Sequence, residues 1–179
     1  QQQKKFKYKL VENNANRNKF ETAIEWLIHA GIVNQSKCIV KPARPLRQDE
    51  NNMSFKLYLL DVGLLSHLAE VSIFDVLQNE KYDYLGALTE NYVAQTFVAQ
   101  NRKLCYWISG NEAEVDFLLT LDNSIIPCEV KSSDNVKAKS LQEYVKRYEP
   151  NYSIRISAKN FGFENNIKAV PLYAVHCLR

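Results

Sequence analysis

The predicted fold depends most on residues 114–131. This stretch reads Glu114-Val115-Asp116-Phe117-Leu118-Leu119-Thr120-Leu121-Asp122-Asn123-Ser124-Ile125-Ile126-Pro127-Cys128-Glu129-Val130-Lys131. Apolar residues alternate over 114–121 and again over 125–131, which is typical of β-strands. Between them lies a turn signal, Asp122-Asn123, to which Ser124 can be added. The stretch therefore predicts an antiparallel hairpin with a loop of two or three residues.

The length of this loop decides which charged side chains face each other. With a loop of two residues, Asp116 lies directly opposite Glu129 and Glu114 opposite Lys131, and all four share one face. With a loop of three residues, Asp116 and Glu129 are separated unless a β-bulge restores the register. The sequence leaves both loop lengths open.

Helical and strand patterns flank the hairpin on both sides. A helix is predicted over residues 84–100, where Gly86, Glu90, Ala94 and Phe97 share a face, so the Glu90 carboxylate points toward a small, apolar surface. The alternative is a helix rotated enough to leave Glu90 in water. The other predicted elements are a partly helical stretch at 64–77, strands at 104–108 and 153–156, a helix at 136–148 and an apolar piece at 170–175. This order predicts an α/β fold.

The first third of the chain predicts a different unit. Residues 18–31 have helical spacing and end at a glycine, and strands are expected at 38–40 and 57–60 on either side of a basic loop. This is the order of the last half of a winged helix, in which the wing touches phosphate. A small packing module with solvated lysines is an equally good interpretation. We therefore divide the chain into a winged-helix-like segment, 1–62, and a second domain, 63–179.

Charge divides the chain in a similar way. The 179 residues hold 23 Lys and Arg against 20 Asp and Glu, a formal net charge of +3. Residues 1–50 hold 10 basic and 5 acidic residues, a net of +5, whereas residues 51–179 hold 13 and 15, a net of −2. The basic front is in the right place for a nucleic-acid contact, and the remaining composition is that of an ordinary globular protein.

Several function classes are disfavoured by the composition. The four cysteines lie far apart without a Cys-X-X-Cys pair, which disfavours a disulfide framework or a zinc knuckle and indicates a reducing cytoplasm. No apolar run approaches the roughly 20 residues needed to cross a bilayer, so no membrane contact is expected. Phosphate-binding glycine loops are absent and the chain begins with Gln1, so we expect it to be a fragment of a longer protein.

The paired carboxylates are the feature that carries chemistry. Asp116 opposite Glu129 is a costly like-charge pair unless a cation lies between them, and Mg²⁺ or Mn²⁺ prefers such oxygen ligands. Lys131 could hold an attacking water or offset negative charge on a phosphodiester, and Glu90 could reach in as an outer ligand. The alternative is a cross-strand ion pair among Asp116, Glu129 and Lys131 on a solvated face.

These residues resemble a known signature. Asp116, followed by Glu129-Val130-Lys131, is similar to the motif of the PD-(D/E)XK nuclease superfamily, although Val115 stands where the label has Pro. The resemblance implies a restriction-endonuclease-like αβββαβ core, here preceded by the small winged-helix-like segment.

Over most of the chain, the sequence resembles the C-terminal DUF4143 region of prokaryotic AAA-type ATPases. The similar stretches are Phe55 to Leu65, Gly86 to Ala94, Glu114 to Phe117, and Glu129 to Lys131. The resemblance implies an upstream ATPase domain, through which alone ATP would be bound. It also implies a catalytic set and metal ligands: Glu90, Asp116, Glu129 and Lys131 would be catalytic, and Asp116, Glu129 and Glu90 would hold Mg²⁺ or Mn²⁺, with Glu114 as an acidic neighbour.

We therefore expect a nucleic-acid-binding domain that has DNA and an ATPase domain as partners and acts as a Mg-dependent deoxyribonuclease. The alternative is a catalytically inactive DNA- or protein-binding module that regulates the ATPase. A protein-interaction domain with no nucleic-acid role is a third interpretation.

Overall fold

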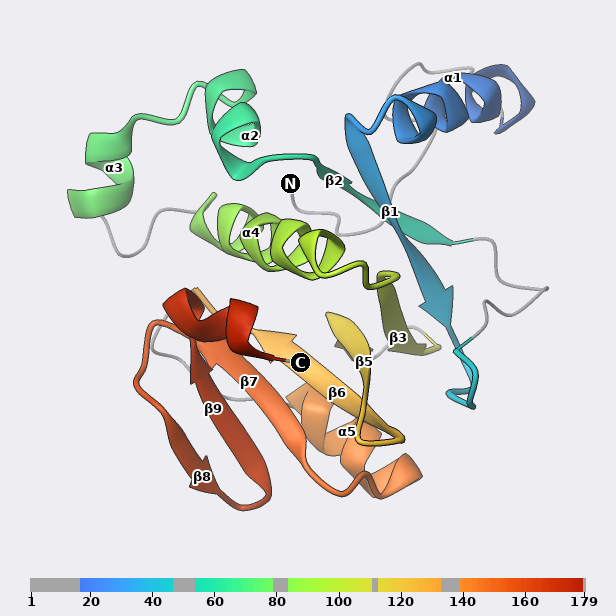
Figure 1. Cartoon of the computed structure of the whole chain (residues 1–179), viewed down its shortest axis with the longest axis vertical. Helices are drawn as coiled ribbons and strands as arrows, with labels where there is room; N and C mark the ends of the chain where they lie inside the picture. Colours follow the sequence, from blue (N-terminus) through green and yellow to red (C-terminus); the bar gives the residue numbers. More distant parts are fainter. Residues whose placement is uncertain (1–16, 47–53, 79–83, 111–112, 133–138, 179) are drawn as a thin grey trace.

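Two β-sheets and five α-helices form the part of the chain described by the computed structural model, residues 17–46, 54–78, 84–110, 113–132 and 139–178. The first sheet has the order β2-β1-β3-β4 and the second the order β5-β6-β7-β9-β8 (Figure 1). The helices are α1 (Arg17–His29), α2 (Val62–Leu68), α3 (Ile73–Gln78), α4 (Leu85–Ala99) and α5 (Lys139–Tyr148), followed by a 3₁₀ helix at Leu172–Cys177. The strands are β1 (Val33–Ile39), β2 (Phe55–Leu59), β3 (Cys105–Ser109), β4 (Ala113–Val115), β5 (Phe117–Leu121), β6 (Ser124–Val130), β7 (Ser153–Ser157), β8 (Gly162–Glu164) and β9 (Ile167–Pro171).

The hairpin of β5 and β6 has the two-residue loop. Leu121 pairs with Ser124, and the pairing continues to Phe117 and Cys128. Asp122 and Asn123 both have positive φ, 46° and 61°, as a type I′ turn requires. Of the two loop lengths that the sequence left open, the structure therefore has the shorter one, and the register expected for that loop holds along β5.

The strand predicted over residues 114–121 is interrupted at Asp116. Before the break, β4 pairs with β3 and places Glu114 opposite Ile108, whereas after it β5 pairs with β6. The prediction that Glu114 lies opposite Lys131 is therefore wrong, because the chain bends at Asp116 and passes from one sheet to the other.

Helices cover both faces of the second sheet. Val93, Ala94 and Phe97 of α4 pack on one face, where the Phe97 and Phe117 rings meet edge to face at 5.4 Å. On the other side, Leu141 and Tyr144 of α5 share a core cluster with Leu118 of β5, and the Tyr144 ring also meets Trp107 of β3 in the first sheet, with ring centroids 5.1 Å apart. Figure 1 shows α4 and α5 on opposite sides of β6. The predicted helices at 84–100 and 136–148 are thus present, the second from residue 139 in the described part.

The first sheet joins the two predicted segments of the chain. β1 and β2 form an antiparallel hairpin, and β1 also pairs in parallel with β3. The strands expected at 38–40 and 57–60 are present but begin earlier, at Val33 and Phe55. The order helix, strand, strand is as predicted, while its identity as a winged helix and the division at residue 62 stay predictions. Most of the basic N-terminal stretch, at 1–16, and the loop residues 47–53 lie outside the described residues.

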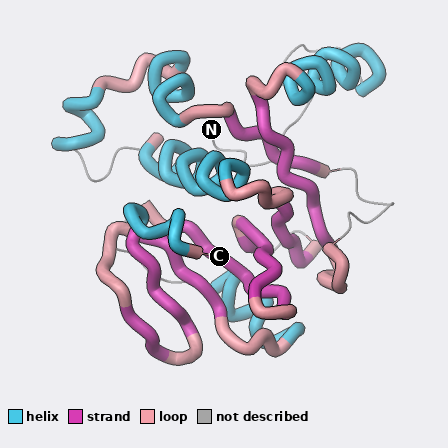
Figure 2. Tube along the Cα trace, viewed as in Figure 1, coloured by secondary structure: helices cyan, strands magenta, loops and turns pink. Residues whose placement is uncertain are grey.

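One hairpin was not predicted. β8 and β9 pair around Asn165-Asn166, whose φ angles of 50° and 56° are positive (Figure 2). Asparagine tolerates this conformation, so the Asn-Asn pair was the available turn signal. β8 is short and exposed, without the apolar alternation that marks a strand.

Within the described residues, no helix is both long and apolar enough to cross a membrane.

Phe117 of β5 is expected to hold the second sheet against α4 and β2. Its side chain is buried between Phe97 and Tyr58, just after the bend at Asp116. Phe117→Ala should lower the free energy of unfolding by about 3–5 kcal/mol, because it removes a fully buried ring. Phe163→Ala, at an exposed position on β8, is the matched control and should change it by less than about 0.5 kcal/mol. Equal losses in urea-unfolding experiments on the two variants would contradict this arrangement of the core.

Candidate functional site

A buried lysine lies at the centre of the candidate site. Lys56 is the second residue of β2, opposite Ser36 of β1, and only 2% of it is exposed. Tyr58, two residues further along the strand, points to the same side because side chains alternate. The Lys56 ammonium also lies 5.1 Å from the centroid of the buried Tyr106 ring, with which it makes a cation–π contact.

Three carboxylates from different elements surround this ammonium. Lys56 Nζ lies 2.8 Å from Glu90 Oε1, 2.8 Å from Glu114 Oε1 and 3.8 Å from Asp116 Oδ1. The Tyr58 hydroxyl donates a 2.5 Å hydrogen bond to the same Glu90 oxygen. We call Lys56, Tyr58, Glu90, Glu114 and Asp116 the Lys56 cluster.

The position of Glu90 follows from how α4 is fixed to β2. The neighbouring Asn91 side chain accepts a 2.8 Å hydrogen bond from the backbone N–H of Leu59 and donates a 3.1 Å bond to its carbonyl. Gln95, one turn further, accepts a 2.6 Å bond from the Val62 N–H. These bonds fix the rotation of α4, so Glu90 faces Lys56 and not water, as the inward-facing interpretation of the sequence expected.

Asp116 links the Lys56 cluster to a second pair of charges. Its Oδ2 accepts a 2.9 Å hydrogen bond from the Val130 N–H of β6, while Oδ1 faces Lys56. Because Val130 directly follows Glu129 in β6, this bond brings the Asp116 side chain next to Glu129 in the chain. Glu129 in turn forms an ion pair with Lys131. The four sequence-predicted residues, Glu90, Asp116, Glu129 and Lys131, are therefore brought into two adjoining groups.

Burial and charge act on this site in opposite directions. Burial alone would lower the pKa of the Lys56 ammonium, but Glu90, Asp116 and Glu114 outweigh it and raise that pKa above its ordinary value. The pKa of the Tyr58 phenol is well above its ordinary value, because of burial and then because of Glu90. Lys56 therefore stays charged and Tyr58 stays neutral at physiological pH.

Lys56 is the site residue that sequence reasoning missed. It belongs to the N-terminal segment, 34 residues before Glu90, and no local pattern connects the two. One signal was present: Phe55-Lys56-Leu57-Tyr58-Leu59 places a lysine and a tyrosine on one face of an otherwise apolar strand. A lysine in that position needs a buried partner, because lysine is almost never fully buried unpaired.

The carboxylates have the right chemistry for Mg²⁺ or Mn²⁺ but the wrong arrangement. Oxygen donors suit both ions, and Asp116 and Glu129 are neighbours. However, Glu90 and Asp116 face Lys56, and Glu129 is paired with Lys131. Among the described residues, no group of three or more His, Cys, Asp or Glu is placed to hold a metal ion. The site as folded does not fit the metal that the resemblance implies.

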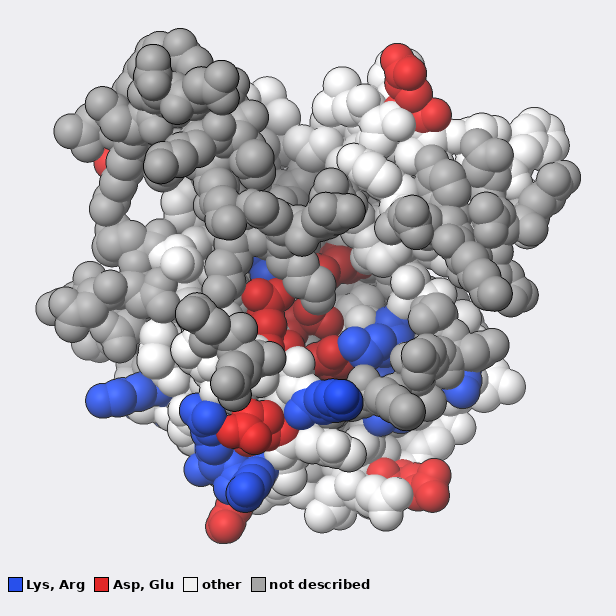
Figure 3. Space-filling view, turned by 180° about the vertical axis from the view of Figure 1, so that it is seen from behind, with Lys and Arg blue, Asp and Glu red and all other residues white. Residues whose placement is uncertain are grey.

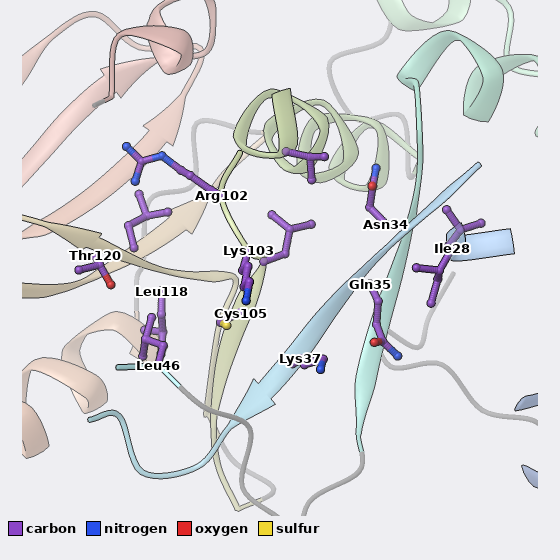
Figure 4. A pocket seen from close by; sticks show the side chains of 14 residues that line it. Ile28, Asn34, Gln35, Lys37, Leu46, Arg102, Lys103, Cys105, Leu118 and Thr120 are labelled. Carbon is purple, nitrogen blue, oxygen red and sulfur yellow. The ribbon is translucent and has the colours of Figure 1, made fainter. Parts of the chain in front are cut away.

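A separate cavity of about 870 Å³ lies on the opposite face of the first sheet. Lys37 pairs with Cys105 across β1 and β3, and Lys103 precedes Cys105 by two residues, so the three side chains share this face (Figure 4). Both lysines are exposed. Arg102 also lines the cavity, but its guanidinium donates a 2.8 Å bond to the Leu178 carbonyl. The described lining residues include no Asp or Glu.

Acidic and basic side chains are unevenly spread over the surface. Figure 3 shows acidic side chains gathered in a hollow near the centre of one face, with basic side chains beside them. Among the described residues, the Lys56 cluster together with Glu129 and Lys131 places four carboxylates beside two ammonium groups. The described part of this region is therefore rich in carboxylates, in contrast to the cavity near Lys37 and Lys103.

Comparison with protein families assigns the second half of the chain. A family model described as "Domain of unknown function (DUF4143)" matches residues 85–175, just over half of the 179 residues, and the chain belongs to this family. A second model, "Domain of unknown function (DUF8612)", matches residues 1–75. Lys56 lies in the second match and its carboxylate partners in the first. Neither the curated proteins nor the solved structures searched give a match.

Alkaline pH is expected to weaken the fold through Lys56. Because its pKa is raised above the ordinary 10.5, the stability it supplies is complete below that pH and is lost as the pH rises toward the folded-state pKa. The free energy of unfolding, measured in urea between about pH 8 and pH 11, should fall more steeply above about pH 10.5 in the wild type than in Lys56→Met. Tyr58 acts in the same direction but is present in both proteins. If the free energy of unfolding depends on pH in the same way in both proteins, folding does not raise the pKa of Lys56, and the prediction is wrong.

Proposed function

We propose that this chain binds nucleic acid on a nuclease-like frame without cleaving it, as the C-terminal part of an AAA-type ATPase. Support for the frame comes from the order α4, β3, β4–β5, β6, α5, β7, in which β4 and β5 form one bent strand. That order agrees with the αβββαβ core that the PD-(D/E)XK resemblance implies. Binding of ATP would belong to a domain outside this chain, and the proposed setting is the cytoplasm.

The observation that carries nucleic-acid binding is the cationic cavity between the two sheets. Lys37 of β1 and Lys103, two residues before β3, are both exposed and both line this cavity. Their ammonium groups are therefore available to phosphate oxygens on the same side of the first sheet. Phosphate contacts of this kind supply most of the affinity of sequence-independent binding.

The acidic region supports binding without cleavage. Its described carboxylates are engaged by Lys56 and Lys131, an arrangement that offers a phosphate oxygen no exposed cation such as the cavity has in Lys37 and Lys103. A phosphodiester is therefore expected to contact the protein at Lys37 and Lys103 and not at Asp116.

Salt dependence tests the binding proposal. The double variant Lys37→Ala/Lys103→Ala should weaken binding to duplex DNA and reduce the slope of log K against log salt by about 2, because two phosphate contacts are lost. Lys146→Ala/Lys168→Ala removes the same charge from exposed positions on α5 and β9 and is the matched control. Fluorescence anisotropy at several salt concentrations measures both. If the two double variants lose the same amount of affinity, the cavity is not the binding surface.

A second candidate function, metal-dependent cleavage of DNA, is favoured by the neighbouring Asp116 and Glu129 with Lys131 beside them. Incubation of plasmid with the protein and Mg²⁺ or Mn²⁺ decides between the candidates. We expect no cleavage by the wild type, Asp116→Ala or Lys131→Ala. Nicking by the wild type that both substitutions abolish would favour the nuclease over the binding module.

A further inference from the structure

We infer that Lys56 is a built-in cation, which takes the place of a divalent metal ion at this site and closes the site to Mg²⁺ and Mn²⁺. The inference goes beyond nucleic-acid binding, because it concerns the charge balance of the acidic region and stands whether or not the cavity binds DNA. It also explains why the carboxylates do not fit the metal ion that the resemblance implies: their oxygens face the Lys56 ammonium instead.

The geometry around Lys56 Nζ is that of a cation among its ligands. Carboxylate oxygens approach from helix α4 (Glu90, 2.8 Å), strand β4 (Glu114, 2.8 Å) and the β4–β5 bend (Asp116, 3.8 Å). An ammonium has three donors and no acceptor, so it can satisfy acids arriving from several directions. Three elements that are separate in sequence therefore meet at one charge.

Burial makes this charge necessary. Lys56 is 2% exposed and Asp116 is 1% exposed, and the side chains of Glu90 and Glu114 are 13% and 19% exposed, so water screens these carboxylates from one another only weakly. Like charges in such surroundings destabilise each other unless a cation or protons intervene. The position of the ammonium is set by β2, because the pairing of β2 with β1 places Lys56 opposite Ser36.

The two family segments share this site. Lys56 and Tyr58 come from the segment that matches DUF8612, and Glu90, Glu114 and Asp116 come from the segment that matches DUF4143. Within the described residues, the ammonium that contacts these three carboxylates comes from the first segment and not from the second. Once the Lys56 ammonium is removed, a hard divalent ion is the natural replacement, because it prefers carboxylate oxygens and compensates more than one of them.

Thermal unfolding with Mn²⁺ as the probe tests the inference. The melting temperature of the wild type should be the same in Mn²⁺ and in EDTA. Lys56→Met, which keeps the apolar stem and removes the charge, should melt at a lower temperature in EDTA. Mn²⁺ at about 100 times its dissociation constant should then raise its melting temperature by roughly 5–10 °C.

Two further variants make the result specific. Lys168→Met removes an exposed lysine from β9 and should behave as the wild type does. Adding Glu90→Gln and Asp116→Asn to Lys56→Met removes two of the stranded carboxylates, so this variant should be more stable in EDTA than Lys56→Met and should not respond to Mn²⁺. If Lys56→Met fails to fold in EDTA, recovery of folded protein on refolding with Mn²⁺, but not with EDTA, is the equivalent supporting result.

Two outcomes would overturn the inference. One is a wild-type protein that Mn²⁺ stabilises through Asp116, shown by loss of the shift in Asp116→Asn, because the site would then hold a metal beside Lys56. The other is a Lys56→Met variant that neither binds Mn²⁺ in calorimetry nor regains stability or folding with it. Melting temperature and calorimetry are both measured without DNA. A negative result for Lys56 is therefore distinguishable from a negative result for DNA binding in the Lys37→Ala/Lys103→Ala variant.

Discussion

The contact between one ammonium group and three carboxylates is the interaction on which the rest of this structure depends. Lys56 is 2% exposed, and its partners come from α4, β4 and the bend before β5. Breaking a buried ion pair by removing one partner generally costs about 3–5 kcal/mol, because the other charge is left uncompensated. Removal of any one partner would therefore weaken the attachment of the N-terminal hairpin to the C-terminal layer of helices and strands.

Asp116 is the residue through which this constraint reaches the second sheet. One of its oxygens faces Lys56 and the other accepts the Val130 N–H. The same residue is the point where the chain leaves the first sheet and enters the second. A single side chain thus joins the charge cluster, the bend and the β5–β6 register, which is why it is buried although it is an aspartate.

The charges of the molecule are divided between two faces of the first sheet. On one face, carboxylates are compensated by Lys56 from within the fold, and on the other, Lys37 and Lys103 are exposed beside a cavity without acidic lining residues in the described part. The proposed binding function rests on this division, because phosphate would contact the exposed lysines and not the carboxylates that Lys56 compensates.

Local sequence patterns determined much of the fold. The Asp-Asn turn and the alternation on either side of it predicted the β5–β6 hairpin and limited its loop to two or three residues, and the structure has the shorter loop. The spacing of α4 likewise offered an inward-facing Glu90 as one of two interpretations. The bend at Asp116 was not predicted, because an alternating run looks the same whether its two halves pair with one strand or with two. The Asn165-Asn166 turn carried a signal, but β8 lacks the alternation that would have marked a strand.

What only the tertiary structure decided is the cation of the site. The sequence placed two carboxylates side by side and required a positive charge near them, for which a metal ion was the expected answer. The structure supplies Lys56, from a strand that reaches the site only because β1 pairs with both β2 and β3 and because Asn91 fixes α4 on β2. Such pairings depend on the global packing of distant segments, and no local periodicity encodes them.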